Sequence, residues 1–171
     1  MKRTMAGRGW FSAITAVDVE RLLALPEPAR WHFAEADDGI VKAAFELHMD
    51  KAWVPIHRAI SDGTLFGTLG ERPLSSAILG DHLICQAELD DFIYLKHPME
   101  VAEIAAALAN LTREGFAEKP DAIPEEDEDA AAFCLDLVPQ DIEYAWPYFE
   151  EMREFYQRAA AGGFAVLFSW G

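Results

Sequence analysis

The chain has 171 residues, of which 51% are hydrophobic and 12% aromatic, a composition typical of a folded globular protein rather than a disordered one. It carries 14 basic against 30 acidic residues, a formal net charge of −16, which argues against a protein that binds the phosphates of nucleic acids or anionic membranes. No apolar run approaches the roughly 20 residues of a membrane span or the continuous apolar part of a signal peptide, so we expect a cytoplasmic protein. The length fits a single domain over residues 1–171.

The N-terminal part is expected to form a strand followed by two short helices. Residues 7–14 (GRGWFSAI) place an apolar run after glycines, which is typical of a strand. A helix is predicted over residues 15–25, because Thr15 can act as its N-cap and apolar residues recur along one face. Pro26 ends this helix, and a second helix is predicted over residues 27–38.

The next segment, residues 39–63, has apolar residues at helical spacing and is predicted to be one long helix or two helices that meet near Asp50. Pro55 decides between these alternatives, because a proline inside a helix removes a backbone hydrogen bond and kinks the axis at a cost of roughly 3 kcal/mol. We favour a break near residues 49–53, with Asp50 as the N-cap of the second helix, so that Pro55 falls near a first turn.

A glycine-rich connection with a short helix at residues 74–79 is expected to lead into two short strands, residues 82–87 and 91–95. A strong helix is predicted over residues 97–111, where Pro98 stands at the first helical position. Its buried stripe is expected to contain Val101, Ile104, Ala105 and Leu108.

The C-terminal part begins with an acidic surface loop at about residues 119–131, followed by an apolar island that fits either a helix or a strand. Residues 140–163 are predicted to form a second long helix, which Pro147 should kink or divide. The last strand, residues 164–170 (FAVLFSW), is apolar throughout and is therefore expected at the centre of a sheet.

Helices and strands are mixed along the chain without regular βαβ alternation, which indicates a single α+β domain with helices packed on a small, mostly antiparallel sheet. We expect the first and last strands to pair, which would bring the termini together. Cys85 and Cys134 each lie in an apolar run and are expected to be reduced, buried thiols. No spacing of cysteines and histidines indicates a zinc site, so we predict no metal and no cofactor.

Four segments, in order along the chain, carry a resemblance to a known protein family. They are DKAWVPIHRAISDG (50–63), RPLSSAILGD (72–81), IYLKHPMEVAEIAAAL (93–108) and IEYAWPYFEEMREFYQRAAAGGFAVLFS (142–169). These segments resemble the signatures of the YfbM-like family, a bacterial domain of unknown function, and the likeness extends from about Gly7 to Ser169. The resemblance implies a single intracellular α+β domain, but the family has no established activity to carry over.

The chain also departs from the family pattern. Pro55 and Pro147 fall in helices where the family has other residues, and Asp81 replaces the second glycine of a Gly-Gly pair. His97 stands where the family usually has a threonine or serine N-cap before Pro98. The acidic loop also looks peculiar to this member.

The segment that follows Met49 supplies the candidate site. On a helical wheel of about 100° per residue, Trp53 lies on the core face while Asp50 and His57 lie on its edge. These two residues would be two turns apart, roughly 10 Å, too far for a direct hydrogen bond but close enough to edge one pocket. Together with Trp53, and with Ser75 and Ser76 from the next segment, they form the candidate ligand-binding set. The alternative is structural: Asp50 and the serines cap helices, and His57 bonds within the core.

Two functions are consistent with these patterns. The first is a non-enzymatic binding or protein-interaction module whose partner has a basic surface, as the acidic charge suggests. The second is a small-molecule enzyme or ligand binder with a pocket edged by Asp50 and His57 and acid–base chemistry. We assign no catalytic residue, because no serine stands in a nucleophile elbow and no complete catalytic constellation is visible.

Overall fold

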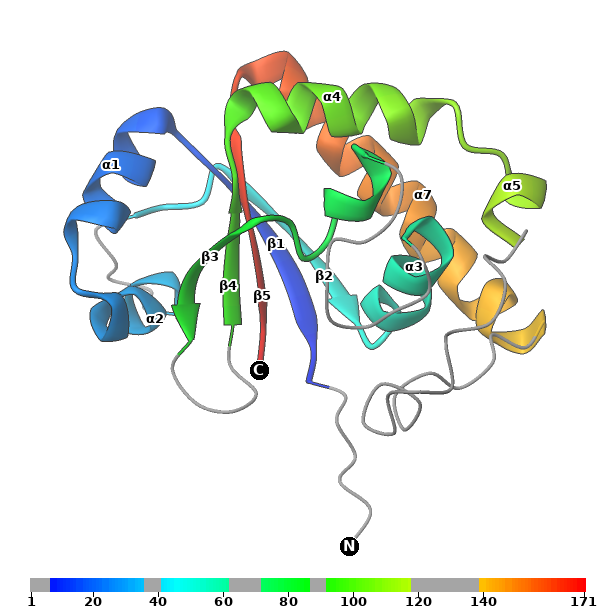
Figure 1. Cartoon of the computed structure of the whole chain (residues 1–171), viewed down its shortest axis with the longest axis horizontal. Coiled ribbons are helices and arrows are strands. Elements are labelled where there is room, and N and C mark those ends of the chain that lie inside the picture. The colour runs from blue at the N-terminus through cyan, green and yellow to red at the C-terminus, as the bar shows by residue number, and fades with distance from the viewer. Residues whose placement is uncertain (1–6, 36–40, 62–71, 87–91, 118–138) are drawn as a thin grey trace, which may run out of the picture.

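A computed structural model of the chain describes residues 7–35, 41–61, 72–86, 92–117 and 139–171 (Figure 1). Its strands are β1 (Gly9–Ile14), β2 (Phe45–Asp50), β3 (His82–Gln86), β4 (Phe92–Lys96) and β5 (Ala165–Trp170). Its helices are α1 (Ala16–Ala24), α2 (Glu27–Glu35), α3 (Trp53–Ile60), α4 (Pro98–Ala109), α5 (Arg113–Ala117) and α7 (Pro139–Gly162), with a 3₁₀ turn η1 (Leu74–Ser76). None of the helices in these ranges combines the length and apolar character that crossing a bilayer requires.

The five strands form one antiparallel sheet in the order β2-β1-β5-β4-β3. β5 lies at its centre, and all six of its residues are buried, as its apolar sequence predicted. β1 pairs with β5 over its whole length, from Gly9 opposite Trp170 to Ile14 opposite Ala165. The expected α+β domain with paired first and last strands is therefore confirmed.

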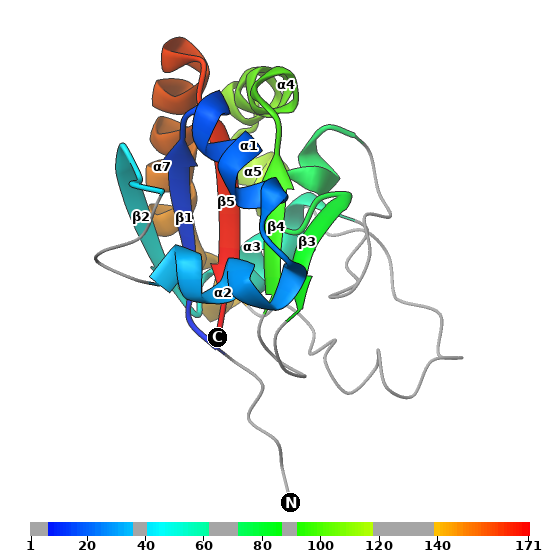
Figure 2. The same ribbon diagram turned by 90° about the vertical axis from the view of Figure 1, so that its left-hand side faces the viewer.

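Helices cover both faces of the sheet, so the core has two layers. Figure 2 shows α1 and α2 on one face, and α3, α4 and α7 on the other. The α1–α2 layer includes Ile14, Val19, Leu22, Trp31, Ile84, Cys85, Ile93, Leu95, Ala165 and Leu167. The larger layer includes Phe11, Met49, Trp53, Ile56, Val101, Ile104, Leu108, Phe149, Met152, Tyr156, Phe168 and Trp170. Alternate residues of β1 and β5 enter opposite layers, which explains why these central strands are mostly apolar, with Ser12 and Ser169 as the polar exceptions.

The prediction of a helix before Asp50 is wrong, because residues 45–50 form strand β2. The sequence FELHMD alternates apolar and polar side chains, and β1 pairs with it from Ala13 to Gly9. The chain then turns at Asp50, whose φ is 45°, and α3 begins at Trp53. The N-cap of α3 is Ala52, without a side-chain bond, so the prediction that Asp50 caps this helix is also wrong. Pro55 lies in the first turn, where the absence of its N–H costs little.

The two long helices agree closely with the sequence patterns. Val101, Ile104, Ala105 and Leu108 of α4 are all buried, as predicted. Helix α7 runs as one element through Pro147, which is exposed, so the division considered for this point does not occur. The short helix expected at residues 74–79 is reduced to η1. The acidic loop, the apolar island after it, Gly63 and Cys134 lie outside the described residues.

Candidate functional site

The sequence-predicted pair, Asp50 and His57, lies on two different elements. Asp50 ends β2, where Arg8 Nε lies 3.5 Å from its Oδ1 and the Tyr144 hydroxyl donates to its Oδ2 at 3.5 Å. His57 lies on α3 and is fully buried. The single helical stripe that placed both side chains on one edge therefore does not exist. A ligand pocket at these residues stays a prediction, and the two cavities described below are lined by other side chains.

Trp53 is a core residue with one polar contact. Its side chain is 2% exposed and stacks on Trp170, with ring centroids 4.7 Å apart and an interplanar angle of 19°. The indole N–H donates to the Gly7 carbonyl at 3.0 Å, which ties the start of the chain to α3. This geometry gives Trp53 a packing role.

Ser75 and Ser76 lie in η1 and are both buried. The turn precedes Gly80, whose φ of 76° is a left-handed conformation that glycine adopts without strain. Two backbone carbonyls just after η1 accept hydrogen bonds from neighbouring elements. Tyr156 of α7 donates to the Ala77 carbonyl, and the Lys96 ammonium donates to the Ile78 carbonyl.

Lys96 and Tyr156 are ionisable residues buried in the core. Lys96 is 1% exposed, at the end of β4, and burial lowers its pKa from 10.5 to about 7, against the opposing effect of Glu100. Tyr156 is also fully buried, and burial, with a smaller effect of Glu100, raises its pKa well above 10.0. Both side chains hold the segment after η1 against the sheet and α7.

A groove lies between the edge strand β2 and helix α7. It has a volume of about 260 Å³ and is lined by Phe45, Glu46, Leu47, Glu151, Glu154, Phe155 and Arg158. Glu151 and Glu154 of α7 supply its carboxylates, because the Glu46 side chain points with Ser12 to the opposite face of β2. Its single guanidinium, that of Arg158, lies 3.9 Å from the centroid of the Phe45 ring. Phe45 and Phe155 meet edge to face at 5.1 Å and form an apolar floor. The groove therefore combines negative charge with apolar contact surface.

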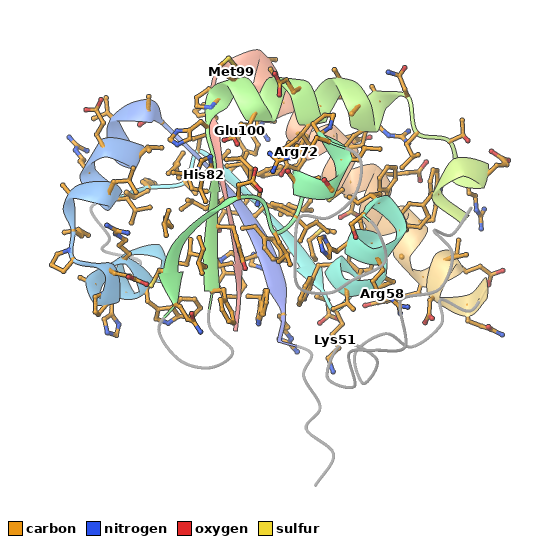
Figure 3. The ribbon with its side chains drawn as sticks, in the orientation of Figure 1. Lys51, Arg58, Arg72, His82, Met99 and Glu100 are labelled. Carbon is orange, nitrogen blue, oxygen red and sulfur yellow. The ribbon has the colours of Figure 1, made fainter. Side chains whose placement is uncertain are left out.

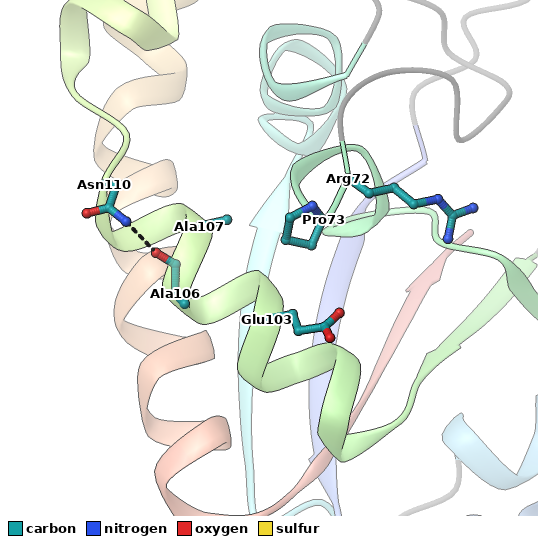
Figure 4. A pocket seen from close by; sticks show the side chains of 6 residues that line it. All are labelled: Arg72, Pro73, Glu103, Ala106, Ala107 and Asn110. Atoms are coloured by element: carbon teal, nitrogen blue, oxygen red, sulfur yellow. Dashed lines mark hydrogen bonds between the residues drawn. The ribbon is translucent and has the colours of Figure 1, made fainter.

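A second, more open hollow lies on the exposed side of α4 (Figure 4). Its volume is about 480 Å³, and it is lined by Arg72, Pro73, Glu103, Ala106, Ala107 and Asn110. Arg72 forms an ion pair with Asp81, and the Asn110 amide donates to the Ala106 carbonyl at 3.0 Å. With its polar groups engaged in this way, the hollow offers a ligand little beyond Glu103 and small apolar side chains.

Three potential metal ligands meet at the N-terminal end of α4: His82, His97 and Glu100. We call them the His–His–Glu cluster. His82 begins β3, His97 is the N-cap of α4, and Glu100 lies in the first turn of that helix. His82 Nε2 lies 3.1 Å from Glu100 Oε1, and the two imidazole rings meet edge to face at 5.2 Å. Figure 3 shows His82 and Glu100 side by side at the start of α4.

Comparison with known proteins places the chain in a family. A family model described as "Domain of unknown function (DUF1877)" matches residues 5–169. The chain belongs to this family. No match was found among curated proteins. Among solved structures, the chain is similar to the protein of unknown function YfbM from Escherichia coli, with a TM-score of 0.63 and 20% identity. The similarity covers 96% of this chain and 99% of that one, and at this identity it shows the fold alone.

Sequence reasoning on this DUF1877 protein missed the His–His–Glu cluster and Lys96. His97 attracted attention only as an unusual N-cap, and His82 lies fifteen residues before it. The signal that could have found the cluster is the strand pairing, because antiparallel β3 and β4 place His82 opposite Leu95. A histidine that begins β3 therefore lies beside the residues that follow β4.

Proposed function

We propose that this DUF1877 protein is a non-enzymatic interaction module that binds a basic segment of a partner protein in the groove between β2 and α7. The observation that carries the proposal is the groove itself, where Glu151 and Glu154 of α7 lie beside an aromatic floor. A lysine or arginine side chain could place its charge near the carboxylates and its aliphatic stem against Phe45 and Phe155. The net charge of −16 would favour the approach of such a partner.

The position of β2 supports an extended peptide as the bound form. β2 is the outermost strand of the sheet and pairs with β1 on one side only among the described residues. Its other edge can offer backbone N–H and C=O groups to an added strand. Backbone pairing along β2 would then place alternate side chains of the peptide toward the groove.

The experiment is a charge reversal in the groove, measured with a library of short peptides that contain lysine or arginine and one leucine or phenylalanine. We expect Glu151→Lys with Glu154→Lys to weaken the best peptides by at least about tenfold, because attraction becomes repulsion. Both positions are exposed on α7, so the fold should be retained. Added salt should weaken binding by the wild-type protein in the same direction.

The matched control reverses two exposed glutamates elsewhere, Glu20 on α1 and Glu114 on α5. This variant has the same net charge as the groove variant. If both variants lose binding equally, attraction is diffuse and the groove is not the site. If no peptide binds the wild type above background, the proposed function is wrong.

The second candidate function, a small-molecule site edged by Asp50 and His57, has its own test. A ligand panel measured by thermal shift would compare the wild type with His57→Ala and Asp50→Asn. A compound that raises the melting temperature of the wild type and of neither variant would favour this function over peptide binding. Because His57 is fully buried, the unliganded His57→Ala protein must first show a cooperative transition.

A further inference from the structure

We propose that His82, His97 and Glu100 form a binding site for a divalent transition-metal ion of the Zn²⁺ class. Two imidazoles and one carboxylate are a ligand set that suits Zn²⁺, Co²⁺ or Ni²⁺ and that occurs in zinc sites with an open fourth position. This site is independent of the proposed peptide groove, because it lies at the β3–β4 side of the sheet and the groove lies at β2.

The distances fit an ion after small side-chain adjustments. The three ligand atoms lie within 4.8 Å of one another, and His82 Nε2 and Glu100 Oε1 are 3.1 Å apart. Ligands bound to zinc at about 2.0–2.2 Å in a tetrahedron lie roughly 3.3–3.5 Å from each other. The distance between His82 Nε2 and Glu100 Oε1 is only slightly shorter than this spacing, so a small outward shift of either side chain would make room for the ion. Rotation of the partly exposed His97 ring would bring the third ligand closer.

Glu100 is held in position by a bond that metal binding would leave intact. Its Oε2 accepts the backbone N–H of His97 at 2.7 Å, as part of a capping box at the start of α4. The other oxygen, Oε1, faces His82. One carboxylate oxygen therefore orients the side chain and the second is available to an ion, which is the usual division between outer-shell contacts and ligands.

The surroundings allow an ion to enter and leave one coordination position to solvent. The side chains of His82 and Glu100 are 45% and 31% exposed. The positive end of the α4 dipole opposes a cation here, and the negative charge of Glu100 offsets it. We therefore expect reversible binding by the folded protein rather than a structural ion on which folding depends.

The test is calorimetric titration of untagged, chelator-treated protein with Zn²⁺ in a mildly alkaline buffer. We expect one saturable site in the wild type, a loss of at least about tenfold in affinity for His82→Ala, and a similar loss for Glu100→Gln. Glutamine at this position still serves the capping box, so Glu100→Gln removes the charge without removing the helix cap. Titration with Co²⁺ should give visible absorption bands that report the coordination geometry.

The control removes two exposed histidines outside the cluster, His32→Ala with His48→Ala. This variant should bind Zn²⁺ like the wild type. Equal binding by wild type and His82→Ala would overturn the proposal, as would the absence of a saturable site. Loss of binding in the control variant alone would assign the ion to the surface histidines and would also overturn it.

Discussion

Trp53→Ala is expected to lower the free energy of unfolding by about 3–5 kcal/mol, the usual cost of emptying a buried tryptophan site. Trp53 stacks on Trp170, and its ring centroid lies 5.6 Å from that of Phe168. It also packs directly over Gly9, where an added Cβ would come within 2.6 Å of the indole ring. Gly9 has no side chain that could move into the space left by the indole, so we expect the cavity to persist.

The measurement is chemical denaturation followed by far-ultraviolet circular dichroism, because removal of a tryptophan alters the fluorescence signal itself. Trp53→Phe should cost less, since it keeps much of the apolar surface and loses the indole hydrogen bond to Gly7. Trp10→Ala, at a half-buried position on β1, controls for the removal of any tryptophan. A loss for Trp53→Ala no larger than the loss for Trp10→Ala would contradict the packing role.

Much of the fold could be predicted because the apolar residues of its long elements form patterns that each fit one type of secondary structure. The apolar stripe of α4 and the continuous apolar run of β5 each allow one interpretation. Strand β2 was missed because Phe45, Leu47 and Met49 alternate for only six residues, next to the real helical pattern of α3. Six alternating apolar and polar residues beside a helix can be mistaken for an extension of that helix. Only the pairing with β1 shows that residues 45–50 form a strand.

The candidate sites were less predictable for a related reason: they depend on contacts between elements. The groove exists because β2 is an edge strand that lies against α7. If residues 45–50 are predicted to be helical, the prediction contains no strand at that edge. The His–His–Glu cluster needs the register of β3 against β4. The acidic charge was visible at once, but charge alone could not indicate which carboxylates surround an apolar floor.

Lys96→Met is expected to raise the free energy of unfolding at neutral pH by roughly 1–3 kcal/mol, even though it removes a hydrogen bond. Burial disfavours the charged form of Lys96 strongly enough to lower its pKa to about 7. Methionine has a similar length and does not carry that desolvation cost. The gain is reduced because the Ile78 carbonyl loses the ammonium that donates to it, which costs about 1–3 kcal/mol.

The pH dependence separates this explanation from a simple packing effect. Because the pKa of Lys96 is lowered on folding, the unfolded chain binds more protons than the folded chain between about pH 7 and 10.5. The stability of the wild type should therefore rise with pH in this window, by at most about 1.4 kcal/mol per pH unit from Lys96. Lys96→Met should lack this rise. The buried tyrosines contribute equally to both proteins, so the difference between the two isolates the lysine.

Lys51→Met provides the matched control, because Lys51 is exposed at the turn between β2 and α3. Its stability should stay within about 0.5 kcal/mol of the wild type at every pH in the window. Both variants should be measured with a chelator present, so that an ion at the His–His–Glu cluster does not contribute. If Lys96→Met and the wild type rise in parallel with pH, the pKa of Lys96 is not lowered on folding and the desolvation argument is wrong.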